Sequence, residues 1–273
     1  MRINQNIAAF NAFRNLSGTN GMLGKSLEKL SSGFRINRAA DDAAGLVKSE
    51  RLRAEINGTR QAVANAQDGI SFVQTAEGAL GEVHSILQRM RTLAIDAANT
   101  ATTDGVPQQA EIDELLAELD AIGARTTFAG NQVFQDYSTT ALTFHVGPNN
   151  GANNRMTISD DMTMASNNVF GTDVSTIDVS SDADTAISTL DTAIGSVSTQ
   201  RSTLGATQNR MEHTINNLQV AQENLSASES RIRDTDMALE MVTFTRNQIM
   251  QQAGTAMLAQ ANAVPQSVLQ LLQ

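Results

Sequence analysis

Two residue types that often supply nucleophiles, bases and metal ligands are scarce, because the 273-residue chain has three histidines and no cysteine. No two of these histidines, His84, His145 and His213, stand four residues apart, which excludes a zinc site of the HExxH type. A chain without cysteine has no thiol nucleophile, thiolate metal site or disulfide. The Gly-rich phosphate-binding motifs and the GxSxG nucleophile motif are also missing. The sequence therefore predicts a protein that is not an enzyme and that needs no metal and no cofactor.

The adjacent carboxylates of Asp41 and Asp42 are the remaining candidates for acid–base chemistry. Side chains of neighbouring residues diverge in direction, and no third group is apparent that would complete such a site. The pair precedes Ala43, Ala44 and Leu46, where a helical pattern begins. Aspartate is favoured at helix N-caps, so we predict that these carboxylates cap a helix.

The longest hydrophobic pattern runs through residues 187–232. Its steps alternate between three and four residues if Arg201, Gln208, Gln222 and Glu229 fill the gaps in the seam. Such a heptad pattern predicts a coiled-coil helix about 69 Å long at about 1.5 Å per residue. The core residues predicted in it are Ile194, Leu204, Met211, Ile215, Leu218 and Leu225. One helix cannot bury this stripe alone, so partner helices of similar length are expected.

Residues 46–98 supply the first partner, because they carry two apolar seams and no proline. A helix that is apolar on two faces is either the central member of a bundle or faces another subunit. A shorter helix follows Pro107. Most of the 11 methionines fit the seams as core fillers.

The middle of the chain has a different pattern, with short apolar runs and turn residues. We predict short strands at 133–134, 141–146 and 155–158, the last two forming a hairpin around the turn 147–151. Residues 159–186 are rich in Ser, Thr, Asp and Asn and are interpreted as loops and short elements.

Both ends of the chain are nearly uncharged but carry apolar stripes. Residues 247–273 have no charged side chain, and residues 1–24 have only Arg2 and Arg14. We predict that these ends form helices that pair with each other and with further copies of the chain, as in an open helical polymer. The assembly residues predicted there are Ile3, Ile7, Phe10, Leu23, Leu27, Val242, Ile249, Leu258 and Leu269.

The predicted fold class is therefore mainly α: a long antiparallel helical coiled-coil bundle with a small β-hairpin region and paired N- and C-terminal helices. We expect a discontinuous inner domain of residues 1–42 and 234–273 and a long-helix domain of residues 43–233, which includes a β and loop region at about 126–186. The net charge of -10 argues against nucleic-acid binding. The sequence contains no run of 18 apolar residues, so no membrane span is predicted, and the N-terminus lacks the pattern of a secretory signal.

Specific motifs at both ends resemble those of bacterial flagellin. In the N-terminal half they are MRIN at 1–4, LSSGFRIN at 30–37, ADDAAGL at 40–46, NAQDGI at 65–70 and QTAEGAL at 74–80. In the C-terminal part they are SESRIRDTDM at 228–237 and AMLAQAN at 256–262. The resemblance covers roughly residues 1–135 and 186–273, and only about 50 residues separate the two parts. It implies a compact flagellin that lacks large outer domains.

The resemblance implies a structural subunit that polymerises into the helical flagellar filament for swimming motility. It also implies that the chain is exported through the flagellar type III apparatus with a chaperone and is located in the extracellular flagellum. Further expected partners are the filament cap and hook-associated proteins. Neither nucleic acid nor a membrane is expected as a partner.

In some flagellins an animal innate immune receptor recognises the pattern Gln-Arg-x-Arg-x-Leu-Ala. Residues 88–94 read QRMRTLA, so the resemblance places Gln88, Arg89 and Leu93 in this patch, with Glu111 from the next helix. We expect the same patch to contact the neighbouring subunit.

Two other functions are compatible with parts of the pattern. A hook–filament junction protein has similar termini but usually lacks the closely spaced motifs of residues 65–80. A secreted coiled-coil effector would not need uncharged ends.

Overall fold

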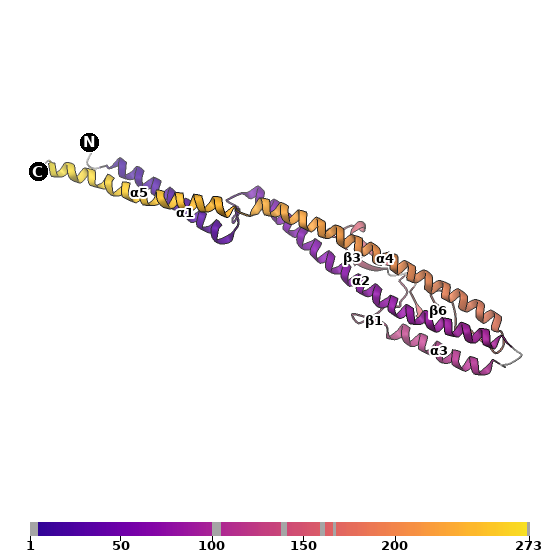
Figure 1. Ribbon diagram of the computed structural model, residues 1–273. Coiled ribbons are helices and arrows are strands. Elements are labelled where there is room, and N and C mark those ends of the chain that lie inside the picture. Colours follow the sequence, from indigo (N-terminus) through magenta and orange to yellow (C-terminus); the bar gives the residue numbers. More distant parts are fainter. Residues whose placement is uncertain (1–4, 100–104, 138–140, 159–161, 166–167, 272–273) are drawn as a thin grey trace. The chain divides into compact units, whose positions relative to one another are not determined.

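The computed structural model describes residues 5–99, 105–137, 141–158, 162–165 and 168–271, with the backbone alone for residues 265–271. These residues form long helices and short strands (Figure 1). The helices are α1 (Ile7–Ser32), α2 (Ala43–Ala97), α3 (Val106–Arg125), α4 (Ala183–Arg233) and α5 (Met237–Leu271). The strands are β1 (Thr127–Phe128), β2 (Asn131–Gln132), β3 (Leu142–His145), β4 (Arg155–Ile158), β5 (Met164–Ala165) and β6 (Asn168–Val169), with a 3-10 turn at Ala152–Asn154. The predicted fold class is confirmed.

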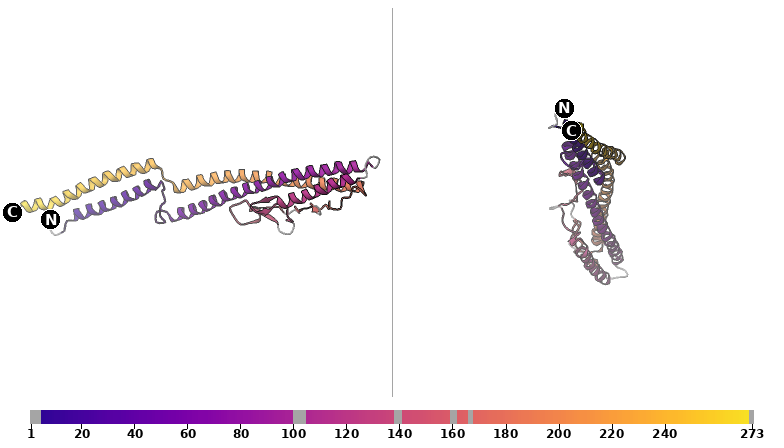
Figure 2. Two further views of the ribbon diagram at one scale, coloured as in Figure 1. Left: turned by 90° about the horizontal axis from the view of Figure 1, so that it is seen from below. Right: turned by 90° about the vertical axis from the view of Figure 1, so that its left-hand side faces the viewer.

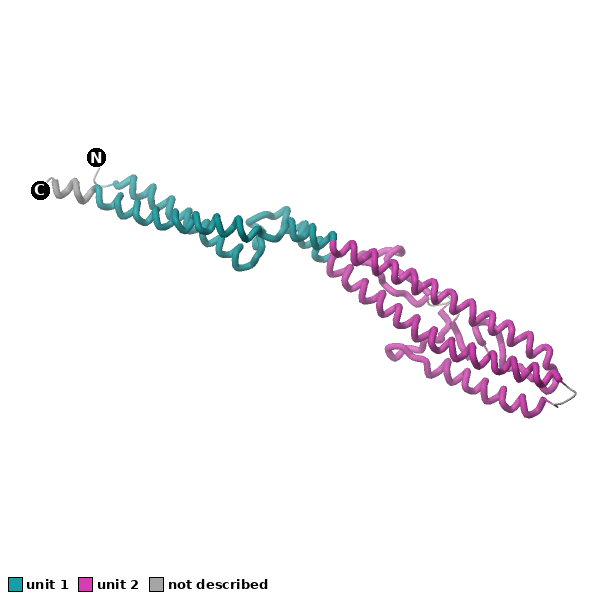
Figure 3. The backbone as a smooth tube through the Cα atoms, viewed as in Figure 1, with its two compact units in different colours: residues 1–54, 224–273 teal, residues 55–223 magenta. Residues whose placement is uncertain are grey.

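The chain divides into two compact units, which Figure 3 distinguishes by colour. Unit 1 contains residues 1–54 and 224–273, and unit 2 contains residues 55–223. Helices α2 and α4 each contribute residues to both units. The domain boundaries predicted from the sequence, 42/43 and 233/234, fall at helix ends, because α2 begins at Ala43 and α4 ends at Arg233.

In unit 1 the two terminal helices lie side by side, as the views in Figures 1 and 2 show. The Asn6 side chain caps α1, because its oxygen accepts a hydrogen bond from the backbone N–H of Ala9. Its amide group donates to the carbonyl of Ala261 on α5 at 2.8 Å. The helices approach closely at Gly254, where an added Cβ would lie 3.2 Å from Cδ1 of Leu16.

Polar side chains and one glycine fix the helix ends of unit 1. Asp42 Oδ1 accepts a hydrogen bond from the N–H of Gly45 at 2.9 Å, which confirms the predicted cap of α2 for Asp42. Asp41 does not cap the helix, because it accepts from the N–H groups of Asn37 and Arg38 in the preceding turn. Asp236 accepts bonds from the N–H groups of Ala238 and Leu239 and caps α5 in the same way. Gly33 ends α1 with a φ of 75°, a left-handed conformation that glycine adopts without the strain of a side chain.

Unit 2 contains most of α2, and both seams of this helix contribute buried residues to the core of the unit, for example Leu80 from one seam and Val83 from the other. Its hydrophobic core combines residues of α2, α3 and α4 with the strand region. Ion pairs join α2 to both neighbours: Arg89 to Glu111 on α3 at 2.7 Å, and Arg201 on α4 to Glu77 at 3.6 Å. Of the two predicted alternatives, the structure therefore shows α2 as the central helix of a bundle.

The buried seam of α4 supports the heptad between Ala186 and Leu218 and corrects two of its polar positions, but the predicted continuation to residue 232 has no buried residue. The buried residues recur in steps of four and three, and Gln200 and Thr207 occupy the places that we assigned to Arg201 and Gln208. Thr207 satisfies its hydroxyl by donating to the carbonyl of Thr203 at 2.9 Å. The full buried set is Ala186, Leu190, Ala193, Val197, Gln200, Leu204, Thr207, Met211 and Leu218. Three predicted core residues, Ile194, Ile215 and Leu225, are half-buried at the edge of this seam.

The strand region contains the predicted hairpin, because β3 pairs antiparallel with β4 from Leu142 opposite Ile158 to His145 opposite Arg155. The predicted strand at 133–134 is wrong. The strands there are β1 and β2, joined by a tight turn in which Ala129 and Gly130 both have positive φ. Val133 and Phe134 follow this turn as buried residues of the core.

Substitution by alanine at two glycines of unit 2 is expected to change stability in opposite directions. A Cβ at Gly123 would collide with the backbone oxygen of Met164, whereas a Cβ at Gly205 in α4 would meet nothing within 4 Å. We expect Gly123→Ala to destabilise unit 2 by about 2 kcal/mol, as overpacked cores do. Gly205→Ala should stabilise the helix by up to about 1 kcal/mol. Urea unfolding of both variants checks this, and equal midpoints for the two would contradict the packing described at Gly123.

Candidate assembly surfaces

The paired terminal helices of unit 1 expose apolar side chains along much of their length. Most of the large exposed hydrophobic residues in the described part of the chain belong to this unit; the exceptions are Ile95, Val106 and Val220. On α1 they are Ile7, Phe10, Phe13, Met22 and Leu27, and on α5 they are Met237, Leu239, Met241, Val242, Ile249, Met250, Met257 and Val264. A two-helix pair has too little surface to bury both stripes, so this apolar surface is available to another molecule.

The terminal residues predicted for assembly divide into three groups in the structure. Ile7, Phe10, Leu27, Val242 and Ile249 are exposed. Leu23 and Leu258 are half-buried in the pair. Ile3 and the side chain of Leu269 lie outside the described residues.

The solvent side of α5 carries a shallow groove with a volume of about 480 Å³. Its lining is apolar except for Thr245 and Arg246. The remaining lining residues are Met241, Val242, Ile249 and Met250. The sequence interpretation that most methionines fill core seams is wrong for this unit, since periodicity alone does not show whether a helix face has a partner.

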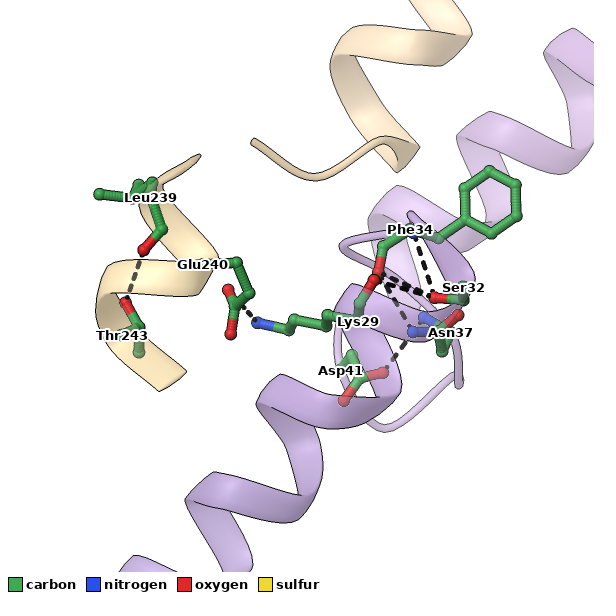
Figure 4. Close-up of polar contacts among 8 residues, drawn as sticks. All are labelled: Lys29, Ser32, Phe34, Asn37, Asp41, Leu239, Glu240 and Thr243. Carbon is green, nitrogen blue, oxygen red and sulfur yellow. Dashed lines mark hydrogen bonds and ion pairs between the residues drawn. The ribbon is translucent and has the colours of Figure 1, made fainter. Parts of the chain in front are cut away.

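A polar cluster holds the α1–α5 pair at the end near Gly33 (Figure 4). The Lys29 ammonium group on α1 lies 3.8 Å from the Glu240 carboxylate on α5. In the turn that follows α1, Asp41 accepts hydrogen bonds from the backbone N–H groups of Arg38 and Asn37. The bond from Arg38 is the main cause of the lowered pKa of Asp41, and burial opposes it; the Asn37 bond and the charges of nearby lysines lower the pKa further.

The two segments that connect the terminal helices to the long helices pair with each other. Phe34 and Asp234 form an antiparallel bridge, and the N–H of Thr235 donates to the carbonyl of Gly33 at 3.0 Å. The Arg233 guanidinium group lies 5.0 Å from the centre of the Phe34 ring and 2.7 Å from the Glu50 carboxylate. A cation over an aromatic ring and an ion pair therefore hold this crossing together.

The predicted patch on unit 2 is partly assembled in the structure. Arg89 and Glu111 form the exposed ion pair between α2 and α3, and Gln88 is exposed beside them with its amide 2.8 Å from Nε2 of His84. Leu93 does not join this surface. It is only 7% exposed and packs in the core, so the inclusion of Leu93 in a patch that contacts a neighbouring subunit is wrong. Its seam is satisfied by the bundle itself.

The described residues provide no metal site and no membrane span. They contain no cluster of three or more potential metal-ligating side chains among His, Cys, Asp and Glu. No helix within them combines the length and apolarity needed to cross a membrane. The features that the structure does show are a helical bundle in unit 2 and an exposed apolar surface on the α1–α5 pair, and both are typical of coiled-coil proteins.

Comparison with known proteins identifies the family. Residues 3–139 match the bacterial flagellin N-terminal helical region, and residues 187–272 match the bacterial flagellin C-terminal helical region. The chain belongs to the bacterial flagellin family, and it is a structural subunit of the flagellar filament, not an enzyme. As a filament subunit, the chain is located in the extracellular flagellum. Membership of this family also implies that the chain polymerises with copies of itself. The possibilities of a hook–filament junction protein and of an effector are thereby set aside.

Several relatives match along their entire length. The chain is 48% identical to a flagellin of Bacillus subtilis (strain 168) over 306 aligned positions that cover all of both chains. It is 49% identical to a flagellin of Halalkalibacterium halodurans over 277 positions and 46% identical to the flagellar filament 33 kDa core protein of Treponema phagedenis over 287, again covering all of each chain. Among solved structures, the crystal structure of Bacillus cereus flagellin aligns with a TM-score of 0.46 and 30% identity, covering 57% of this chain and 88% of that one.

Proposed function

We propose that the apolar surface of the α1–α5 pair is the face through which copies of this chain stack into the filament. The exposed apolar side chains along both helices carry this proposal, because a soluble monomer rarely exposes so continuous an apolar surface. In this proposal residues 1–42 and 234–273 form the inner domain that lines the export channel, and residues 43–233 form a separate long-helix domain.

Sedimentation of the purified chain tests the proposal directly. Addition of short filament fragments as seeds should convert the chain into fibres that pellet on centrifugation. A seeded chain that stays in the supernatant at all concentrations would overturn self-assembly through this surface.

The exposed surface also predicts how stable the terminal helices are before assembly. In the described part of the pair, α1 and α5 pack mainly against each other, so few buried contacts oppose the local unfolding of either helix. In the free chain we expect the amides of residues 7–32 and 237–264 to exchange with solvent at least about a hundredfold faster than those of the core of α2. Hydrogen exchange followed by mass spectrometry measures this. Equal protection of both regions in the dilute chain would contradict it, and protection on polymerisation is expected.

For unit 2 we infer that the Arg89–Glu111 pair is part of the contact between neighbouring subunits and of the surface that an animal immune receptor recognises. The pair is exposed, with more than 40% of each side chain accessible, and a surface ion pair adds less than about 1 kcal/mol to stability. Its charges are therefore available to a partner. The buried Leu93 contributes by holding α2 in the bundle, and Gln88 borders the patch.

Charge reversal separates these roles from folding. Arg89→Asp should leave the melting temperature within a few degrees of the parent while weakening receptor binding and filament formation by about tenfold. Arg210→Asp on α4 is the control, because Arg210 is also exposed and its substitution changes the net charge by the same amount. If Arg89→Asp and Arg210→Asp behave alike in both assays, the patch is only a solvated face.

The route out of the cell is the last part of the proposal. We infer that the chain passes through the flagellar type III apparatus, escorted by a chaperone, and meets the hook-associated proteins and the filament cap at the tip. Helices that open readily suit a chain that is threaded through a channel. Loss of the chain from the culture medium in a strain without the export apparatus tests this, and unchanged secretion would refute it.

A further inference from the structure

The methionines of this protein separate into two groups according to unit. In unit 2 all five, Met90, Met156, Met162, Met164 and Met211, are at most 4% exposed. In unit 1 the five described methionines, Met22, Met237, Met241, Met250 and Met257, are all between 47% and 64% exposed. Because the chain has no cysteine, these five thioethers are its accessible sulfur atoms in the described residues.

The exposed methionines lie within the proposed stacking surface. Met241 and Met250 line the apolar groove of α5 together with Val242 and Ile249. Met237 precedes Met241 by four residues, which places both on one side of the helix. A change in the polarity of these sulfur atoms therefore changes the surface that a second copy would cover.

We propose that these five methionines are oxidation sites, and that peroxide acting on them blocks assembly of free chains until a reductase repairs them. The inference rests on the proposed stacking function of the α1–α5 surface. In the reaction, the thioether sulfur attacks one oxygen of hydrogen peroxide, an S–O bond forms and the O–O bond breaks. The departing hydroxide takes up the proton of the new S–OH group, which leaves the sulfoxide and one molecule of water. Sulfur loses two electrons and the peroxide gains them.

The product explains both the block and its reversal. A sulfoxide is polar and chiral, so it fits poorly where an apolar thioether would be buried between copies. Methionine sulfoxide reductases return it to the thioether at the expense of a thiol, with one enzyme for each sulfoxide epimer. Assembly itself protects, because stacking covers the five sites. Free chains are thus the vulnerable form and filaments the resistant one.

The experiment treats the free full-length chain and the assembled filament with the same concentration of hydrogen peroxide. Mass spectrometry then locates the oxidised residues. In the free chain the five methionines of unit 1 should oxidise at least about tenfold faster than the five of unit 2. In the filament the rate at the five sites should fall by about tenfold or more. Equal rates for the two groups, or equal rates in chain and filament, would overturn the inference.

A second measurement tests the effect on assembly. Seeded polymerisation of the oxidised chain should need about ten times more protein than the untreated chain. Treatment with both sulfoxide reductases and a thiol should restore the original value. The control is a variant with leucine at all five positions, and its polymerisation is compared before and after peroxide treatment. This comparison does not depend on how well the variant polymerises without peroxide. We expect peroxide to leave the polymerisation of this variant unchanged. An oxidised parent that polymerises like the untreated one, or that the reductases fail to restore, would refute the block.

These outcomes are separable from the proposed function. If the untreated chain fails to polymerise on seeds, the stacking proposal is wrong, and the block of assembly falls with it. The selective oxidation of unit 1 in the free chain is read by mass spectrometry alone and is decided whatever the polymerisation shows.

Discussion

Leu204→Asp is expected to unfold unit 2 and abolish swimming. Leu204 is 1% exposed and lies in the core that joins α2, α3 and α4. A carboxylate at this position would be removed from water without a partner, at a cost of at least about 4 kcal/mol. For a unit of this size that corresponds to a melting temperature lower by about 10 °C or more. Circular dichroism during heating measures the change, and motility in soft agar reports the consequence.

Ser202→Asp is the matched control for this variant. Ser202 lies two residues away on the same helix and is exposed, so an added carboxylate there stays in water. We expect a change within about 0.5 kcal/mol of the parent. A Leu204→Asp chain that melts with the parent and swims would show that the heptad seam of α4 is not the core of unit 2.

The sequence predicted the long helices well, because their patterns extend over many turns. Proline, glycine and aspartate mark the ends: Gly33 ends α1, Asp42 caps α2 and Asp236 caps α5. The heptad of α4 was recognised from its apolar members. Where a seam position carries a polar residue instead of an apolar one, the pattern does not distinguish between two neighbouring residues. For that reason Gln200 and Thr207 were not distinguished from their neighbours.

The errors in the candidate sites have a common physical cause. Periodicity shows that a helix face is apolar but not what covers it. Leu93 belongs to a seam for which we left contact with another subunit open, and α2 in fact uses this seam within the bundle. The opposite error concerns the methionines, most of which we interpreted as core fillers, whereas Met241 and Met250 are exposed.

The strand region shows a different limit. Apolar and β-prone residues at 133–134 suggested a strand, yet the ladder lies at Thr127–Phe128 and Asn131–Gln132. The turn between these strands sets the register, because Ala129 and Gly130 both adopt positive φ. The Ala129 conformation is uncommon for a residue other than glycine or asparagine, so it could not be predicted from the residue type.

Ile249→Asp is expected to have the opposite effect from Leu204→Asp: the free chain folds, but the filament does not form. Ile249 is 60% exposed and lines the α5 groove, so a carboxylate there remains solvated in the free chain. The melting temperature of unit 2 should stay within about 2 °C of the parent. In a stack of copies the same carboxylate would be buried without a partner, which costs about 3 kcal/mol and raises the protein concentration needed for polymerisation by about a hundredfold.

Comparison of Ile249→Asp with Ser202→Asp separates stacking from net charge, because both variants add one negative charge at an exposed position. Seeded sedimentation should show fibres for Ser202→Asp and none for Ile249→Asp at equal concentration. If both pellet equally, the apolar surface of α5 is not the stacking surface, and subunit contacts would have to come from unit 2. If neither pellets, added negative charge alone prevents assembly, and the groove around Ile249 has no special part in it.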